Sequence, residues 1–80
     1  MNKVIIYSKN NCQPCNLTKL YLAENDIEFE ERNISTSETH MKELQELGYQ
    51  SVPITLVNGT VVANGFEPWK LEAALQEETK

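Results

Sequence analysis

The chain of 80 residues has few of the features that define membrane proteins or nucleic-acid-binding proteins. It contains no run approaching the ~20 apolar residues that a membrane-spanning helix needs. Its seven Lys and Arg residues are scattered and are outnumbered by twelve Asp and Glu residues, which gives a formal net charge of −5. Because phosphate backbones are held by clustered positive charge, the sequence predicts a protein that binds neither nucleic acid nor a membrane.

Cysteine is also scarce, with only two residues, Cys12 and Cys15, three positions apart. A disulfide between them closes a loop too short to restrict the unfolded chain, so it would add little stability. The apolar stretch over residues 4–7 is shorter than a signal-peptide core of about 7–15 residues, so we expect a cytoplasmic protein. In the cytoplasm, paired cysteines are more often catalytic or metal-binding than structural.

Hydrophobic periodicity and turn residues predict one domain over residues 1–80. Asn58-Gly59 is typical of a type I′ hairpin turn. Ser35 and Glu38 have the capping-box spacing that starts a helix, and Gly48 would end that helix. The expected elements are a strand over 4–7, a helix over 14–25, a strand over 27–30, a helix between 38 and 48, two hairpin strands over 54–57 and 61–62, and a helix from Pro68 onward.

The order βαβαββα predicts an α/β fold with a four-stranded mixed sheet covered by three helices. In the first of these helices, Leu17, Leu20 and Tyr21 repeat at helical spacing and are expected to form the buried face. The acidic residues of the second strand and its end are expected to be solvated; they are Glu28, Glu30 and Glu31.

The strongest chemical signal is the motif Cys12-Gln13-Pro14-Cys15, which lies between the first strand and the first helix. Residues three apart on a helix share a face, with Cβ atoms about 5–6 Å apart. A small adjustment gives disulfide geometry, so the pair can open and close with little backbone movement. This arrangement predicts a redox-active pair with no metal ion.

The two sulfurs are expected to differ in reactivity. Cys12 lies at the helix start, where free N–H groups and the helix dipole favour a thiolate, so it is the predicted nucleophile. Cys15 lies one turn into the helix, is more shielded, and is the predicted resolving thiol. Lys9 either favours the Cys12 thiolate or is simply a solvated lysine. Gln13 and Pro14, between the cysteines, are further candidates for contact with a partner, and Pro14 also stiffens this loop.

A second candidate site segment is Val52-Pro53, directly before a predicted strand. An X-Pro bond is usually trans, and a proline here can be ordinary punctuation. With a Cys-x-x-Cys motif in the first helix, we favour a cis Val52–Pro53 bond facing the cysteines. The backbone of Val52 would then be free to pair with a substrate strand.

Three segments together resemble the glutaredoxin-like branch of the thioredoxin superfamily, over nearly the whole chain. They are residues 7–15 (Y-S-K-N-N-C-Q-P-C), residues 51–53 (S-V-P) and residues 65–71 (G-F-E-P-W-K-L). Within that branch the chain is most similar to the NrdH-redoxins. This resemblance implies a thioredoxin fold and dithiol–disulfide exchange with no organic cofactor. It also implies electrons taken from thioredoxin reductase and passed to a class Ib ribonucleotide reductase.

The resemblance implies that Phe66 and Pro68 shape the surface beside the active site, and it makes Gly65 and Phe66 candidate partner-binding residues. The chain departs from the family pattern at three neighbouring positions. Glu67 stands where Arg is usual, Trp69 where Asp is usual, and Ala63 where the family tends to carry Trp. These departures concern the identity of the partner rather than the redox chemistry.

Two other functions remain open from the sequence. In the first, glutathione is the electron donor, although the C-Q-P-C motif differs from the C-P-Y-C of most glutathione-using glutaredoxins. In the second, the protein is a Cu(I) chaperone, since small βαββαβ copper carriers hold a Cys-x-x-Cys pair at the same junction. Asn10 stands where those carriers usually have Met. We expect a monomer, because an electron shuttle presents one face to two partners in turn.

Overall fold

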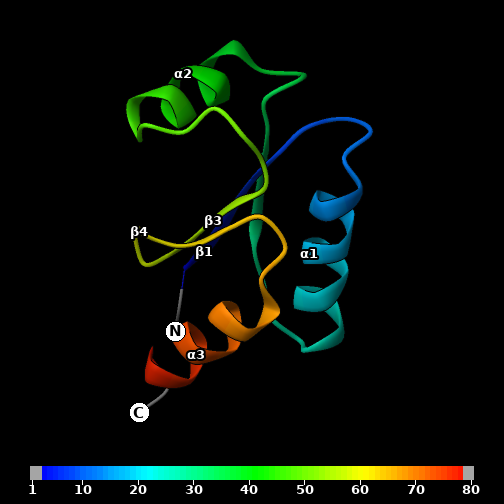
Figure 1. Ribbon diagram of the computed structural model, residues 1–80, viewed down its shortest axis with the longest axis vertical. Coiled ribbons are helices and arrows are strands. Elements are labelled where there is room, and N and C mark those ends of the chain that lie inside the picture. Colours follow the sequence, from blue (N-terminus) through cyan, green and yellow to red (C-terminus); the bar gives the residue numbers. More distant parts are fainter. Residues whose placement is uncertain (1–2, 79–80) are drawn as a thin grey trace.

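The computed structural model describes residues 3–78, with side chains as far as residue 75 (Figure 1). The expected order βαβαββα is confirmed. The elements are β1 (Val4–Ser8), α1 (Gln13–Glu24), β2 (Glu30–Asn33), α2 (Glu38–Glu46), β3 (Ile54–Val57), β4 (Thr60–Asn64) and α3 (Pro68–Glu78). Among these described residues, no helix combines the length and apolar character needed to cross a bilayer.

The four strands form one mixed sheet in the order β2-β1-β3-β4. β1 runs parallel to β2 and antiparallel to β3, and β3 runs antiparallel to β4. Asn58 and Gly59 join β3 to β4 with φ angles of 52° and 86°, as a type I′ turn requires. The predicted α/β fold with four strands and three helices is therefore confirmed.

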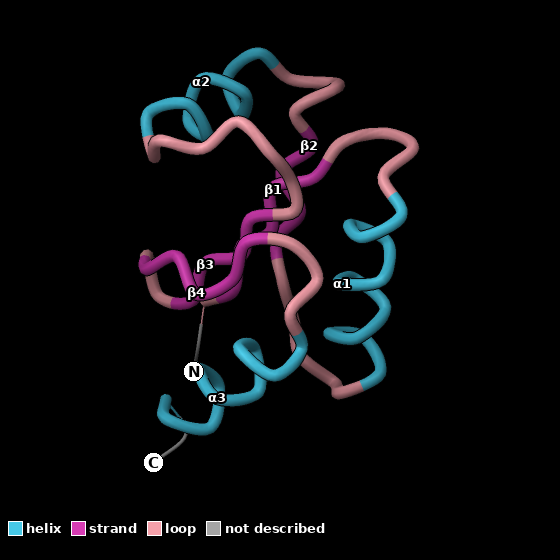
Figure 2. The backbone as a smooth tube through the Cα atoms, viewed as in Figure 1, coloured by secondary structure: helices cyan, strands magenta, loops and turns pink. Residues whose placement is uncertain are grey.

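Helices cover both faces of the sheet, so the chain forms three layers (Figure 2). On one face, Leu44 of α2 packs against alternate residues of β1 and β3, which are Ile5, Tyr7, Ile54 and Leu56. On the other face, Leu22 of α1 and Leu75 of α3 pack against Val4 and Val57. The period-2 alternation along β1 and β3 thus divides the core between the two helical layers.

The buried face of α1 differs from the predicted one. Cys15, Thr18 and Leu22 face the sheet, whereas Leu17 and Leu20 are exposed. The burial of Cys15 at the N-terminal end of α1 sets which side of this helix faces the sheet. Thr18 and Leu22, three and seven residues further along, lie on the same side and are also buried. The apolar spacing from Leu17 was therefore the wrong guide to the face.

The second strand was predicted too early in the chain. β2 begins at Glu30, which pairs with Ile5, and not at Ile27. Ile27 and Phe29 instead pack on the core from the connection between α1 and β2. The apolar alternation that suggested a strand is due to this packing, while β2 itself is polar because it lies at the sheet edge.

The start of α2 also differs from the expected capping box. Ser37 is the N-cap, and its Oγ accepts a hydrogen bond from the His40 N–H at 3.3 Å. Ser35, the predicted cap, lies two residues earlier and accepts a hydrogen bond from the Asn10 N–H. Gly48, with φ 90°, follows the C-cap of α2, as predicted.

A charged cluster joins α2 to the sheet. Nη1 of Arg32 donates to the Tyr7 hydroxyl oxygen at 3.0 Å and lies 3.2 Å from a Glu43 carboxylate oxygen. Burial is the largest cause of the raised pKa of Tyr7. Nδ1 of His40 lies 3.1 Å from the same Glu43 carboxylate, and a hydrogen bond from His40 is the main cause of the lowered pKa of Glu43. Sequence reasoning did not find this cluster, because its members come from three separate elements.

Candidate active site

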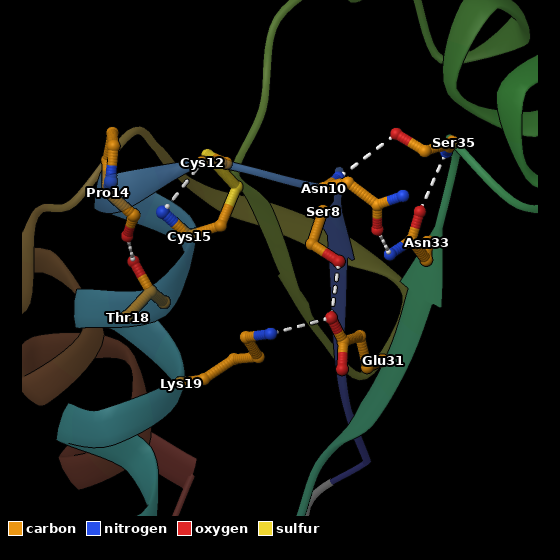
Figure 3. Close-up of a disulfide and its surroundings, with 10 residues drawn as sticks. All are labelled: Ser8, Asn10, Cys12, Pro14, Cys15, Thr18, Lys19, Glu31, Asn33 and Ser35. Carbon is orange, nitrogen blue, oxygen red and sulfur yellow. Dashed lines mark hydrogen bonds and ion pairs between the residues drawn. A yellow bond between two sulfur atoms is a disulfide. The ribbon is translucent and has the colours of Figure 1, made fainter.

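A disulfide joins Cys12 to Cys15 at the junction of β1 and α1 (Figure 3). The two Cα atoms are 5.2 Å apart, a separation usual for disulfides. Cys12 has extended backbone angles and is the N-cap of α1, so the helix begins directly after it. Pro14 lies in the first helical turn, where its missing N–H leaves no helical bond unmade.

The surroundings of the two sulfurs differ in the predicted sense. Cys15 is 0% exposed, while Cys12 retains 5% of its surface. The Cys15 N–H donates a hydrogen bond to Sγ of Cys12 at 3.2 Å. A sulfur at a helix N-terminus that accepts a backbone N–H is favoured as a thiolate. The geometry therefore suits Cys12 for attack and Cys15 for resolution.

The predicted cis peptide bond between Val52 and Pro53 is present. The Pro53 carbonyl accepts a hydrogen bond from the Gly65 N–H at 2.8 Å, so the segment before α3 lies beside Pro53. Gly65 has φ 97°, and Phe66 after it is half-buried. The structure thus brings Pro53 and Gly65, two of the predicted site residues, together.

Glu67, one of the departures from the family pattern, bonds only to residues close to it in the sequence among those described. One carboxylate oxygen accepts the Asn64 N–H at 2.9 Å, and the other lies 3.1 Å from Nζ of Lys70. The hydrogen bond from Asn64 is the main cause of the lowered pKa of Glu67, with Lys70 the second. Glu67 therefore shapes the loop before α3 with its charge already compensated.

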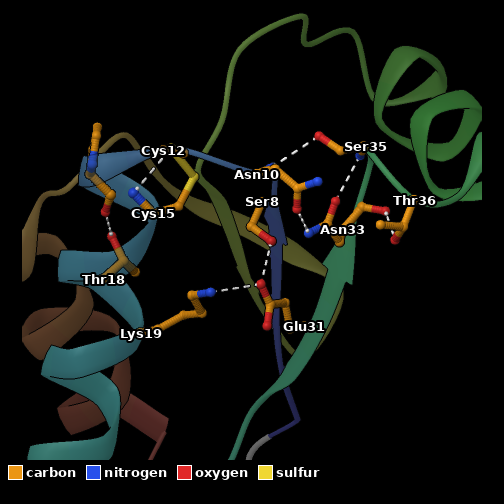
Figure 4. A network of polar contacts seen from close by, with 11 residues as sticks. Ser8, Asn10, Cys12, Cys15, Thr18, Lys19, Glu31, Asn33, Ser35 and Thr36 are labelled. Carbon is orange, nitrogen blue, oxygen red and sulfur yellow. Dashed lines mark hydrogen bonds and ion pairs between the residues drawn. A yellow bond between two sulfur atoms is a disulfide. The ribbon is translucent and has the colours of Figure 1, made fainter.

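The loop that carries Cys12 is attached to the end of β2, the strand beside β1, by a network of hydrogen bonds (Figure 4). Oδ1 of Asn10 accepts a hydrogen bond from Nδ2 of Asn33 at 3.0 Å, and the Asn10 N–H donates to Oγ of Ser35 at 3.0 Å. The Ser35 N–H donates to Oδ1 of Asn33 at 2.7 Å. Sequence reasoning missed this network, because only the register of β1 with β2 brings these residues together.

Glu31 is bonded rather than freely solvated, which corrects the sequence prediction. One of its carboxylate oxygens accepts the fully buried Ser8 hydroxyl at 2.6 Å and lies 2.8 Å from Nζ of Lys19 on α1 (Figure 3). The hydrogen bond from Lys19, followed by that from Ser8, lowers the pKa of Glu31 below its ordinary value. These contacts connect the end of β1 and the catalytic helix to β2.

We expect the Glu31→Gln variant to lose part of the acid sensitivity of the protein. A carboxylate with a pKa lowered on folding stabilises the protein above its unfolded pKa, near 4.5, and loses that contribution as the pH falls through its folded pKa. Below pH about 4.5, the free energy of unfolding should therefore fall more steeply in the parent protein than in Glu31→Gln. Urea unfolding between pH 7 and pH 3 measures both curves.

A Glu28→Gln variant changes the net charge by the same amount and is the control. Its curve should follow that of the parent protein. Parallel curves for the parent and Glu31→Gln would show that the contacts of Glu31 with Ser8 and Lys19 contribute nothing to stability.

The remaining predicted contact residues lie on the surface. Lys9 and Gln13 are exposed on either side of Cys12, and no carboxylate in the described part of the chain pairs with Lys9. Trp69 in the first turn of α3 is 64% exposed. Their roles in partner binding remain predictions. Among the side chains that the structure describes, residues 3–75, no three His, Cys, Asp or Glu converge as a group that could hold a metal ion.

A Cys-x-x-Cys disulfide at a helix N-terminus, with a cis-proline turn, on a βαβαββα fold defines a thiol–disulfide oxidoreductase of the thioredoxin fold. The element order differs from the βαββαβ order of the small copper carriers. Residues 4–62 match the family model described as glutaredoxin. The chain therefore belongs to the glutaredoxin family.

Among individual relatives, the chain is similar to NrdH-redoxins. The glutaredoxin-like protein NrdH of Lactococcus lactis subsp. lactis (strain IL1403) is 34% identical over 68 residues, which cover 85% of this chain and 93% of that protein. The crystal structure of the thioredoxin-like protein BC3987 has a TM-score of 0.82 at 26% identity, covering 89% of this chain and 97% of that one. The NrdH-redoxin of Escherichia coli shares the fold, with a TM-score of 0.80 at 22% identity and coverage of 89% and 92%.

Proposed function

We propose that this protein is a cytoplasmic, monomeric electron carrier that reduces protein disulfides through Cys12 and Cys15. Its reductant is thioredoxin reductase, and its target is a class Ib ribonucleotide reductase. It needs no organic cofactor or metal, because the dithiol itself carries the two electrons. The observation that carries this proposal is the disulfide at the N-terminus of α1, in which Cys12 keeps 5% of its surface exposed and Cys15 keeps none.

The reaction proceeds in two exchanges. The Cys12 thiolate attacks one sulfur of the target disulfide, and the first target thiolate leaves and takes up a proton. Cys15 then loses its proton and attacks Sγ of Cys12, which reforms the Cys12–Cys15 bond and releases the second target thiolate. The helix N-terminus stabilises Cys12 as the attacking thiolate, and again as a thiolate when the reductase reopens the disulfide. The reductase returns two electrons, and two protons complete the dithiol.

The target is held as an extended segment beside Val52. Within residues 3–78, the backbone of Val52 takes part in no hydrogen bond between backbone groups, and it lies outside β3. A backbone N–H and C=O without backbone partners suit the addition of a short strand. The Gly65–Pro53 hydrogen bond fixes the loop with Phe66 beside this strand site, so Gly65 and Phe66 form its second border.

The charges around the site favour a polypeptide over glutathione as the bound group. Glutathione carries two carboxylates and an amine. The segments that form the site (residues 9–15, 51–53 and 64–66) contain one charged side chain, Lys9. The nearby carboxylate of Glu67 is already bonded to Asn64 and Lys70, so it is not free for the glutathione amine. Recognition by backbone pairing and neutral side chains requires none of these charges.

A coupled NADPH-oxidation assay on a model protein disulfide tests the choice of reductant. One reaction contains thioredoxin reductase, and the other contains glutathione with glutathione reductase. We expect turnover at least about tenfold faster with thioredoxin reductase, equivalent to about 1.4 kcal/mol of transition-state stabilisation. Faster turnover with glutathione would make the protein a dithiol glutaredoxin and would remove ribonucleotide reductase as the first target to test.

A further inference from the structure

One buried hydroxyl in the described part of the chain lacks a hydrogen-bond partner. The side chain of Thr55 in β3 is 0% exposed. Among the side chains of residues 3–75, its Oγ1 is the buried oxygen or nitrogen with no hydrogen-bond partner. Leaving a buried hydroxyl unpaired is unfavourable, because it has lost its hydrogen bonds to water and gained none in return. Valine has nearly the same shape and would carry no such cost, so the hydroxyl needs an explanation.

The strand register places Thr55 under the catalytic helix. Thr55 pairs with Ile6 of β1 and shares a face of β3 with Val57, because side chains alternate along a strand. Val57 packs against Leu22 of α1. Along β3, the step of two residues from Val57 back to Thr55 covers about 7 Å. Along α1, the step of four residues from Leu22 back to Thr18 covers about 6 Å. Both steps lead toward the end of the sheet at which α1 begins. Thr55 therefore lies at the level of Thr18.

Cys15 is the next residue of α1 on this face, three positions before Thr18 and fully buried. The two other buried hydroxyls of this layer are occupied. Thr18 donates to the Pro14 carbonyl at 2.9 Å, and Ser8 donates to Glu31 at 2.6 Å. Thr55 thus combines a free donor with a position on the sheet face that α1 covers, one helical turn from the level of the resolving cysteine.

We propose that the Thr55 hydroxyl donates a hydrogen bond to Sγ of Cys15 when the disulfide is open. In the disulfide, the Cys15 sulfur is neutral and bonded to Cys12, and Thr55 has no partner. Reduction adds two electrons and two protons and frees this sulfur. Thr55 then stabilises the dithiol form, and most strongly the Cys15 thiolate that forms during resolution, because hydrogen bonds to charged groups are the stronger ones.

The inference rests on the redox cycle proposed for Cys12 and Cys15, but not on the identity of the reductant or target. The experiment is the equilibrium between disulfide and dithiol in glutathione buffers, measured for the parent protein and for Thr55→Val. We expect the constant for reduction to fall about tenfold in Thr55→Val, which for two electrons is about 30 mV toward a more negative potential. The Thr55→Ser variant keeps the hydroxyl and should restore the parent value.

Unfolding of both redox forms separates this role from simple packing. Thr55→Val should leave the disulfide form as stable as the parent or more stable, and should destabilise the dithiol form. Thr18→Val, which removes a hydroxyl with a partner in the same layer, should destabilise both forms alike. Equal shifts of both forms in Thr55→Val, with an unchanged equilibrium constant, would show that Thr55 only fills space. A parent protein that does not equilibrate with glutathione buffers at all would instead contradict the redox cycle.

Discussion

The Cys12→Ser variant should have no measurable turnover in protein-disulfide reduction. Cys12 provides the attacking thiolate, and a serine hydroxyl at this position has far too high a pKa to replace it at neutral pH. The expected loss is at least about a thousandfold, as when an enzyme loses its nucleophile. NADPH consumption with thioredoxin reductase and a model protein disulfide measures the loss.

The Cys15→Ser variant is the matched counterpart, and its behaviour should differ in kind. It keeps the Cys12 thiolate, so the first exchange proceeds, but no second thiol releases the target. A mixed disulfide between Cys12 and the target should accumulate, visible as a species of summed mass that a reducing agent cleaves. Full turnover in Cys15→Ser would show that the second thiol is not needed and would overturn the two-exchange mechanism.

The Leu22→Ala variant should have the largest effect on stability among single changes in α1. Leu22 is 0% exposed and joins α1 to Val4, Val57 and Leu75 in one core cluster. Removing a buried leucine side chain costs about 2–5 kcal/mol, part transfer free energy and part cavity. Since a domain of this size has on the order of 5–10 kcal/mol of stability in total, the urea midpoint should fall sharply.

Leu20→Ala on the same helix provides the control. Leu20 is 54% exposed, so its loss should change the free energy of unfolding by less than about 0.5 kcal/mol. Alanine is also the better helix former, which offsets part of the lost contact. A larger cost for Leu20→Ala than for Leu22→Ala would mean that α1 faces the sheet by the side first predicted from the sequence.

The parts of the fold that the sequence predicted depend on local signals. The Asn58-Gly59 turn needs positive φ at two successive residues, a requirement that few residue pairs meet. A polar turn follows the buried first strand, and Pro14 comes shortly after this turn, at a position where a helix accepts proline. Cys12 is the cap residue just before this helix. The cis bond before Pro53 was predicted from the Cys-x-x-Cys motif together with the resemblance to the glutaredoxin-like branch, since a proline before a strand is otherwise ordinary.

The parts that sequence reasoning missed depend on contacts between distant elements. Alternation over residues 27–30 suggested a strand, yet β2 starts at Glu30, where the chain meets Ile5 of β1. The sequence does not predict the hydrogen bonds that connect β1 and its following loop to β2. Hydrophobic periodicity shows which side of an element is buried, but it does not show which polar side chains bond to one another. Four side chains take part in these bonds. They are Ser8, Asn10, Glu31 and Asn33.

The central claim is that the Cys12–Cys15 bond opens and closes to carry two electrons between proteins. It is tested most directly by a single-turnover transfer. The protein is reduced, freed of reductant and mixed with a stoichiometric protein disulfide, and its free thiols are alkylated and located by mass spectrometry. We expect the alkylated fraction of Cys12 and Cys15 to fall as the alkylated fraction of two target cysteines rises by the same amount. Persistence of both thiols alongside an unreduced target would contradict the account.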